Sequence, residues 1–322
     1  MTFIPFFNLF LCDKIKFIFL IKFIFLREDI LLMIKTYFKY FLALLLFGLN
    51  GIVASHITMN SYEIVFTRTL IGSLFLMAIY AFSKNKLTFY KNKKHFLFLA
   101  LSGIAMGTSW MFLYEAYSSI GVSLSSLAYY CGPVIVMAVT PLIFKENLSK
   151  IKVFGFIIVL LGMLFVNGME LKNGGISFGL FCGIMSAFMY AFMVIFNKKA
   201  ESITGLENSM IQLIISFLTV AVFVLFKKGI DVSKISENIV YILILGILNT
   251  GVGCYFYFSS IQKLSATTVS VCGYIEPLSA VIFSVILLEE KLTFVQTIGA
   301  IFIIGGAILS ETLDLYIKKH LE

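Results

Sequence analysis

Ten apolar runs of about twenty residues limit what this chain can fold into more than any other feature. A helix of about 20 apolar residues crosses roughly 30 Å of hydrocarbon. Open strands would leave backbone N–H and C=O groups unsatisfied in lipid. The sequence therefore predicts an all-α integral membrane protein of about ten transmembrane helices, with spans near 38–57, 62–83, 96–117, 121–144, 151–168, 176–196, 208–226, 238–260, 265–288 and 294–311.

The composition excludes a soluble fold. Of the 322 residues, 60% are hydrophobic and 13% are charged, whereas a soluble domain carries about 25% charged residues. The mean hydropathy is +1.00. A net charge of +8 would suggest nucleic acid in a soluble protein, but here the lysines stand in short connections between apolar runs. We therefore expect a lipid bilayer as the surroundings and no nucleic-acid partner.

The lysines also predict how the chain is oriented, because cytoplasmic loops carry an excess of positive charge. If the first span begins in the cytoplasm, the inside segments hold fifteen lysines and the outside loops hold five. The segment Ser83–His95 alone carries five of the inside lysines. This predicts a multi-pass protein of the cytoplasmic (inner) membrane with both termini in the cytoplasm, including a tail over 313–322.

The chain repeats itself at an offset of 144 positions. Proline, glutamate and glycine coincide at this offset, and they are rarer in apolar spans than chance matches of Leu, Ile or Phe. Each half holds five spans, so the second half enters the membrane from the opposite side, as in the inverted-topology repeats of secondary transporters. The coinciding pairs include Gly107/Gly251, Pro133/Pro277, Glu146/Glu290, Gly155/Gly299 and Gly162/Gly306.

Two stretches that coincide at this offset carry a family resemblance. Ala128–Gly162 and Cys272–Gly306 each contain a mid-helix proline, an apolar run, Glu-x-Leu-Ser/Thr in a turn, and then a glycine-containing helix. This pattern resembles the repeat signature of the drug/metabolite transporter superfamily, EamA type. Arg68 also resembles the family's arginine in the second span. The resemblance covers roughly 38–312 and implies a two-repeat permease with repeats at 38–168 and 176–312.

The resemblance implies a secondary transporter that moves a small organic metabolite or drug-like solute across the cytoplasmic membrane by alternating access. Proton coupling and assembly into a homodimer are left open. Two alternatives remain, an integral-membrane lipid-modifying enzyme and a non-transporting membrane sensor. A lipid-modifying enzyme would need a polar catalytic cluster at the membrane interface. The sequence contains no such cluster, so we expect a protein that is not an enzyme.

We expect no metal and no cofactor. Cys131, Cys182, Cys254 and Cys272 lie in apolar spans without CxxC spacing, which is typical of small core residues. The three histidines are isolated from one another.

Residues 1–32 do not belong to the family pattern, because Lys14, Lys16 and Lys22 interrupt their apolar run. They contain no small-residue cleavage site of a signal peptide. A surface-lying amphipathic helix is one interpretation. We favour another, in which Met33 is the native start and the extension is not translated.

Glu276 is the leading candidate for function. It lies about eleven residues into the ninth span, near the bilayer midplane, directly before Pro277. An ionised carboxylate there costs roughly 3 kcal/mol, so it must be protonated, paired or facing a wet cavity. Its repeat partner is Gly132, so the shared fold does not need the carboxylate. The hypothesis is that Glu276 binds a cationic group or exchanges a proton; a neutral packing role is the alternative.

Further candidates line the expected cavity or shape it. Ligand pockets are largely apolar and aromatic with a few polar groups, whereas Tyr and Trp near span ends mark the membrane interface. The candidate substrate-binding residues are Glu276, Tyr274, Tyr130, Trp110, Tyr114, Asn50, Asn249 and Tyr255.

Pro133 and Pro277 are predicted kinks or hinges, because proline removes a helical hydrogen bond. Glu146 and Glu290 are interpreted as structural residues at helix ends. Arg68 is expected either to reach the membrane surface or to pair with Glu63 or Glu115, with attraction of an anion as the alternative. The fifth and tenth spans carry few polar side chains and are expected at the periphery.

Overall fold

The computed structural model describes residues 31–120, 125, 128–145, 148–167, 178–226, 237–287, 293–295, 297–306 and 309. These residues form helices and their connections, with no strand among them. The expected extension over 1–32 falls outside them except for its last two residues, and the tail over 313–322 falls outside them entirely. Glu146 and Glu290, the predicted helix-end residues, also lie outside the described part of the chain.

The first half begins with a helical span over Leu31–Ser55, whose last turns form α2 (Asn50–Ser55). It continues with α3 (Ser61–Phe82), the short η1 (Phe89–Lys91), α4 (Lys93–Ile120), α6 (Cys131–Phe144) and α7 (Lys150–Asn167). The second half contains α8 (Phe178–Lys199), α9 (Gly205–Phe226), and the consecutive α11 (Ile239–Leu243), η3 (Ile244–Val252) and α12 (Gly253–Ile261). It ends with α13 (Ala266–Cys272), α14 (Ile275–Leu287) and a helix over Thr297–Gly306.

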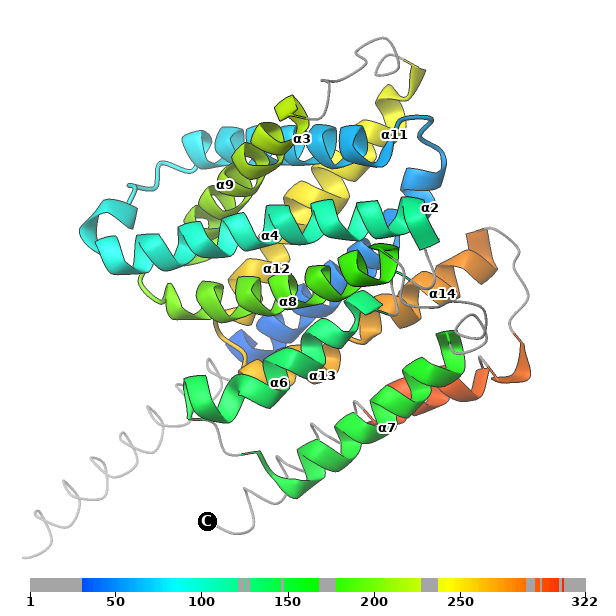
Figure 1. Ribbon diagram of the computed structural model, residues 1–322. Coiled ribbons are helices and arrows are strands. Elements are labelled where there is room, and N and C mark those ends of the chain that lie inside the picture. Colours follow the sequence, from blue (N-terminus) through cyan, green and yellow to red (C-terminus); the bar gives the residue numbers. More distant parts are fainter. Residues whose placement is uncertain are drawn as a thin grey trace, which may run out of the picture.

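The described helices confirm the all-α membrane fold. Seven are long and apolar enough to cross a membrane, and two shorter apolar helices, Cys131–Phe144 and Thr297–Gly306, accompany them. Figure 1 shows them as a bundle in which most helices run roughly alongside one another. Large apolar side chains such as Phe154 and Ile301 are exposed on the outside. In a bilayer, lipid tails cover such surfaces without cost.

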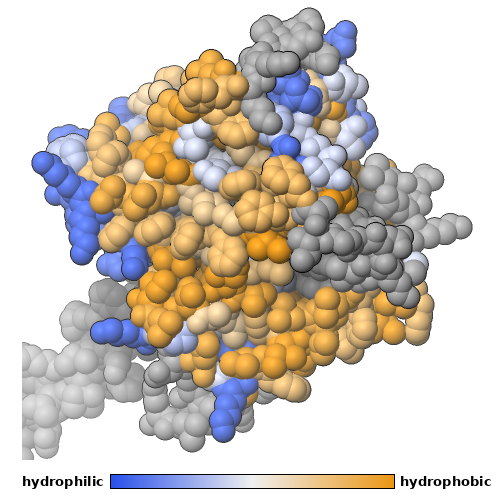
Figure 2. All heavy atoms as spheres, in the orientation of Figure 1, coloured by the Kyte–Doolittle hydropathy of each residue, from blue (hydrophilic) through white to orange (hydrophobic). Residues whose placement is uncertain are grey.

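The outer surface shows the same division between lipid and water. In Figure 2, hydrophobic residues cover most of the visible face, and strongly hydrophilic groups gather at its left edge. That edge corresponds to the turn between α3 and α4 in Figure 1. This turn carries the exposed lysines Lys84, Lys86, Lys91, Lys93 and Lys94.

The element bounds follow the repeat. The bounds of α9 are those of α3 displaced by 144 positions. The first residue of α14 stands 144 positions after that of α6, and the last residue of α8 stands 144 positions after Ser55. The internal repeat read from a few prolines and glycines therefore extends through the secondary structure of both halves.

Four glycines show how the halves are related in space. A Cβ atom at Gly162 would lie 2.6 Å from the Gly299 carbonyl oxygen, and one at Gly306 would lie 2.6 Å from the Gly155 carbonyl oxygen. At the offset of 144, Gly162 is equivalent to Gly306 and Gly155 is equivalent to Gly299. The two contacts therefore join equivalent residues with the two halves exchanged. Such reciprocal contacts are those of a two-fold axis. The axis passes between α7 and the helix over Thr297–Gly306, which also expose apolar side chains as expected of peripheral helices.

The fourth and ninth spans are interrupted at equivalent places. A turn at Tyr130 precedes α6, and a turn at Gly273–Tyr274 separates α13 from α14. Pro133 and Pro277 consequently occupy the third position of α6 and of α14. A proline is tolerated there because the first N–H groups of a helix have no partner within it. The expected kinks are thus breaks in the spans, and the prolines begin the second segment of each.

The eighth span contains an irregular segment, whereas the equivalent part of the third span, in α4, is regular. Residues Ile244–Val252 form a π-helical segment, whereas the equivalent stretch of α4 is an ordinary α-helix. π-Helical turns are rare and occur frequently at functional sites. This segment carries Asn249 and Thr250, whose buried side chains face the first half of the chain.

Candidate functional site

A cavity lies inside the bundle between the two halves. Its volume is about 40 Å³, measured as the space open to the centre of a water-sized molecule. Small-molecule sites typically have largely apolar and aromatic walls with a few polar groups. Its lining residues are Phe47, Asn50, Met106, Ser109, Trp110, Tyr129, Tyr190, Met193, Cys254, Tyr257, Phe258 and Glu276.

Both repeats build this cavity. The first span, α4 and the segment before α6 supply its lining from the first half, while α8, α12 and α14 supply it from the second. Because the repeats meet here, a relative movement of the halves changes the shape of the cavity. The interrupted spans also end against it, since Tyr129 directly precedes one break and Glu276 follows the other.

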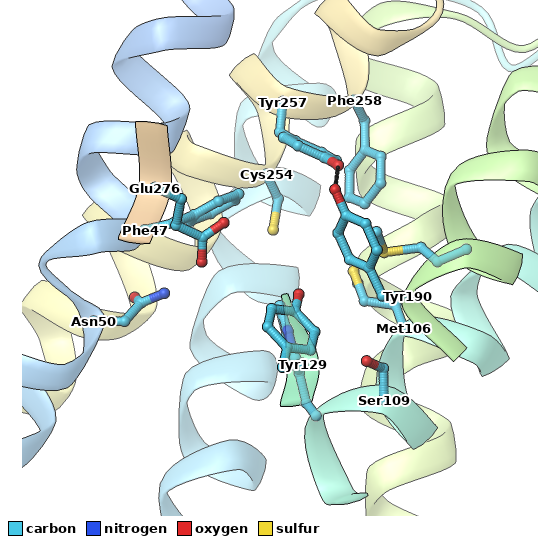
Figure 3. A pocket seen from close by; sticks show the side chains of 12 residues that line it. Phe47, Asn50, Met106, Ser109, Tyr129, Tyr190, Cys254, Tyr257, Phe258 and Glu276 are labelled. Atoms are coloured by element: carbon cyan, nitrogen blue, oxygen red, sulfur yellow. Dashed lines mark hydrogen bonds between the residues drawn. The ribbon is translucent and has the colours of Figure 1, made fainter. Parts of the chain in front are cut away.

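Among the described lining residues, Glu276 provides a carboxylate. It is the second residue of α14, in the turn that follows the break. Helix starts favour carboxylates because their first N–H groups are free of intrahelical partners. In Figure 3 its carboxylate points into the cavity, on the side of Phe47 and Asn50.

The opposite wall is a pair of tyrosines. The hydroxyl groups of Tyr190 and Tyr257 lie 2.9 Å apart and share a hydrogen bond, which connects α8 to α12 (Figure 3). Tyr129 packs edge-on against Tyr190, with ring centroids 5.4 Å apart. The cavity therefore combines one carboxylate with several aromatic faces and hydroxyl groups.

A polar network stands behind the wall formed by Asn50 and Trp110. The Arg68 guanidinium, on α3, is 2% exposed and donates to Thr250 Oγ1 at 2.9 Å. It also donates to Tyr114 Oη at 3.3 Å and to Asn50 Oδ1 at 3.4 Å. Its central carbon lies 4.6 Å from the centre of the Trp110 ring. The expectation that Arg68 reaches the surface or pairs with Glu63 or Glu115 is wrong.

Local contacts explain why Arg68 does not pair with Glu63. Glu63 completes the capping box of α3 with Asn60, which occupies its carboxylate at the start of that helix. Arg68 instead turns inward, where Thr250 on the π-helical segment meets its Nε–H group.

The predicted candidates fall into three groups in space. Glu276, Trp110 and Asn50 line the cavity. Tyr114 and Asn249 belong to the network behind it, where the Asn249 amide donates to Asn50 Oδ1 at 3.1 Å and to the Leu46 carbonyl at 2.8 Å.

Tyr274, Tyr130 and Tyr255 lie away from the lining. The Tyr274 hydroxyl donates to the Tyr130 carbonyl oxygen at 2.7 Å, so this pair joins the two broken spans at equivalent positions. The Tyr255 ring contacts Phe256 and lies below the Lys39 ammonium, 5.2 Å from its centre.

Several lining residues had no signal in the sequence, among them Tyr190, Met193 and Met106. Apolar and aromatic side chains face lipid and cavity alike in a membrane protein, so neither type nor spacing distinguishes them.

Within the described residues there is no group of three or more His, Cys, Asp or Glu that could hold a metal ion. The four described cysteines are free thiols.

A multi-pass helical membrane protein with two inverted five-helix repeats around a central cavity has the architecture of a small-solute carrier. The EamA-like transporter family model matches residues 34–168 and 177–312, and the chain belongs to this family. The two matched segments correspond to the two halves of the bundle.

Relatives carry transporter names. The chain is 24% identical over 278 residues to the uncharacterized transporter YxxF of Bacillus subtilis, covering 84% of this chain and 88% of that one. It is 25% identical over 131 residues to human solute carrier family 35 member G1, covering 41% of this chain and 35% of that protein. A crystal structure of another protein superposes with a TM-score of 0.74 at 15% identity, over 86% of this chain and 98% of the other. That likeness supports the fold.

Proposed function

We propose that this protein is a secondary transporter that moves a small organic solute with a cationic group through the central cavity by alternating access. The proposal rests on the position of Glu276. It is a carboxylate in the wall of an aromatic cavity within the bundle, and its repeat counterpart is Gly132. Intramembrane carboxylates are expensive, so they mark substrate or proton pathways.

The surroundings of Glu276 fit a cationic group. A cation near an aromatic face gains about 0.5–2 kcal/mol, more where water is excluded. Trp110, Tyr129 and Phe47 line the cavity together with the carboxylate. A solute ammonium or a proton could each neutralise Glu276, and exchange between the two would couple transport to a proton gradient.

The repeat supports alternating access. Inverted halves can exchange conformations, so that a site between them faces each side of the membrane in turn. The breaks before α6 and α14 allow the segments on either side of the cavity to reorient without bending a continuous helix. The Tyr274–Tyr130 hydrogen bond joins the two breaks and would couple their movements.

Glu276→Gln tests this function directly. The amide keeps size and hydrogen bonding but cannot ionise. The probe is 2-phenylethylamine, with binding read from thermal stabilisation of purified protein. Hydrogen bonds to charged groups contribute about 1.5–3 kcal/mol, so the variant should bind the amine roughly 10–100-fold more weakly. Uptake into proteoliposomes should respond to an imposed pH gradient for the unmodified protein and not for the variant.

Glu201→Gln is the matched control, because Glu201 is an exposed carboxylate in the turn between α8 and α9. It should bind and transport the amine like the unmodified protein. Equal binding and uptake by Glu276→Gln would contradict the proposed role of Glu276. Failure of the unmodified protein to bind the amine would count against the function itself.

The same proposal places both termini in the cytoplasm, as the lysine-rich turn between α3 and α4 indicates. In a cysteine-free background, Ser55→Cys and Lys86→Cys put single thiols on exposed residues at opposite ends of the bundle. A membrane-impermeant maleimide should label Ser55→Cys in intact cells, and Lys86→Cys only after permeabilisation. The reverse pattern would invert the orientation.

A further inference from the structure

Arg68 is a buried cation, 2% exposed, on α3. Its three hydrogen-bond acceptors, on Thr250, Tyr114 and Asn50, are all neutral. Among the described residues, these three groups and the Trp110 ring are the partners that its guanidinium meets. Burying an ionised group is costly unless an opposite charge or good hydrogen bonds compensate it.

The existing bonds leave the guanidinium with spare capacity. A guanidinium has five N–H donors, and the three bonds use one on each nitrogen. Two of those bonds are long, at 3.3 and 3.4 Å. The Trp110 ring covers the flat face of the group and leaves its edge as the donor side. Bidentate bonds from this edge to an anion would be stronger than the bonds they replace.

Arg68 adjoins the cavity through two lining residues. Asn50 and Trp110 contact the guanidinium and also line the cavity. The Asn50 oxygen accepts from Arg68 and Asn249, so its amide N–H groups remain for other partners, and in Figure 3 they point toward the interior of the cavity.

The repeat shows that the shared fold does not require a charge here. The counterpart of Arg68 is Gln212 on α9, and the counterpart of Thr250 is Met106. The Gln212 amide contacts Met106 Sδ at 4.0 Å, which repeats the Arg68–Thr250 contact in neutral form, and donates to Ser102 Oγ at 2.9 Å. Arg68 and Gln212 are thus equivalent residues that contact equivalent partners, Thr250 and Met106. Of the two, Arg68 alone carries a positive charge.

We propose that Arg68, with the Asn50 amide beside it, forms an anion subsite that binds a carboxylate group of the transported solute. The solute then carries a carboxylate for Arg68 in addition to the cationic group for Glu276. This inference rests on the proposed function, because it assumes that the cavity binds the solute. The guanidinium exchanges its long bonds to Tyr114 and Asn50 for bonds to the carboxylate and keeps Thr250 and the Trp110 face.

Arg68→Gln installs the residue that the other half uses at this position. The probes are 3-phenylpropionate and its primary amide, 3-phenylpropionamide, which differ in charge and share the aromatic body. The unmodified protein should bind the carboxylate more tightly than the amide. The variant should lose about 10–100-fold of that preference. A ratio measured within one variant is insensitive to a general loss of stability.

Arg68→Lys provides the second variant, in case Arg68→Gln folds poorly. It keeps the charge without the planar fork, so it should retain part of the preference, with a stronger dependence on salt. An unchanged preference in Arg68→Gln, or no preference in the unmodified protein, would overturn the proposal. Failure of the proposed function looks different, because 2-phenylethylamine would then bind neither the unmodified protein nor Arg68→Gln.

Discussion

Gly48→Ala is expected to destabilise the protein by about 1–3 kcal/mol, the usual cost of overpacking a filled core, and to impair binding at the cavity. A Cβ atom at this position would overlap Ser279 Oγ and would lie 3.0 Å from the backbone nitrogen of Ala280. It would also lie 3.1 Å from the Glu276 carbonyl oxygen. Backbone atoms cannot move aside as a side chain can. The first span must therefore separate from α14 at the residue that carries the candidate carboxylate.

Gly51→Ala is the matched control on the same helical span. Nothing lies within 4 Å of a Cβ atom at Gly51, and the residue is exposed. Alanine has a higher helix propensity than glycine by about 1 kcal/mol, so this variant should be as stable as the unmodified protein or more so. Thermal unfolding in detergent, together with 2-phenylethylamine binding, checks both variants. Equal midpoints for the two would show that the first span and α14 do not pack as closely as described.

The sequence was a good guide to the fold because a membrane span has few alternatives. Length and apolarity alone predict helices, and an odd number of spans in each repeat predicts an inverted second half. The offset of 144 was found from residues such as Pro133 and Pro277, and it also relates the bounds of α3 to those of α9. The family relationship read from the same residues is confirmed by the match over both halves.

The sequence guided the site less well, because it does not say which face of a helix meets the cavity. Tyr255 and Tyr257 stand two positions apart, yet Tyr257 lines the cavity and Tyr255 lies against Lys39. The π-helical segment precedes both, and its i→i+5 bonding changes the face on which later residues emerge. A pattern based on 3.6 residues per turn cannot anticipate that change.

Glu276 and Arg68 show in different ways how far the sequence predicts the candidate site. A carboxylate near the midplane beside a proline is conspicuous in any sequence, and Glu276 lies in the cavity wall. Arg68 is equally conspicuous, but its expected partners were carboxylates nearby on the same side of the membrane. Its observed partners include Thr250, which is 182 positions away and is reached only through the folded bundle.

The crossing of α7 with the helix over Thr297–Gly306 offers a sharp test of the two-fold relation. Gly306→Ala should be strongly destabilising, because its Cβ atom would meet the Gly155 carbonyl oxygen at 2.6 Å and the Val159 nitrogen at 2.9 Å. Gly305→Ala, one residue away, should be tolerated, because nothing lies within 4 Å of its Cβ atom. Thermal unfolding of both variants in detergent should separate them by at least the 1–3 kcal/mol typical of overpacking.

Gly162→Ala should match Gly306→Ala, since its Cβ atom would meet the Gly299 oxygen at 2.6 Å and the Ile303 nitrogen at 2.9 Å. Both substitutions push the same two helices apart at one crossing. Once the helices have separated, the second methyl group meets less resistance, so the double variant should cost less than the sum of the singles. Strongly unequal single effects, or full additivity, would mean that the two contacts act independently and that the crossing is not two-fold. If the two inverted halves meet at a two-fold axis, the two single variants should lose nearly equal stability. The double variant should then lose less than the sum of the two.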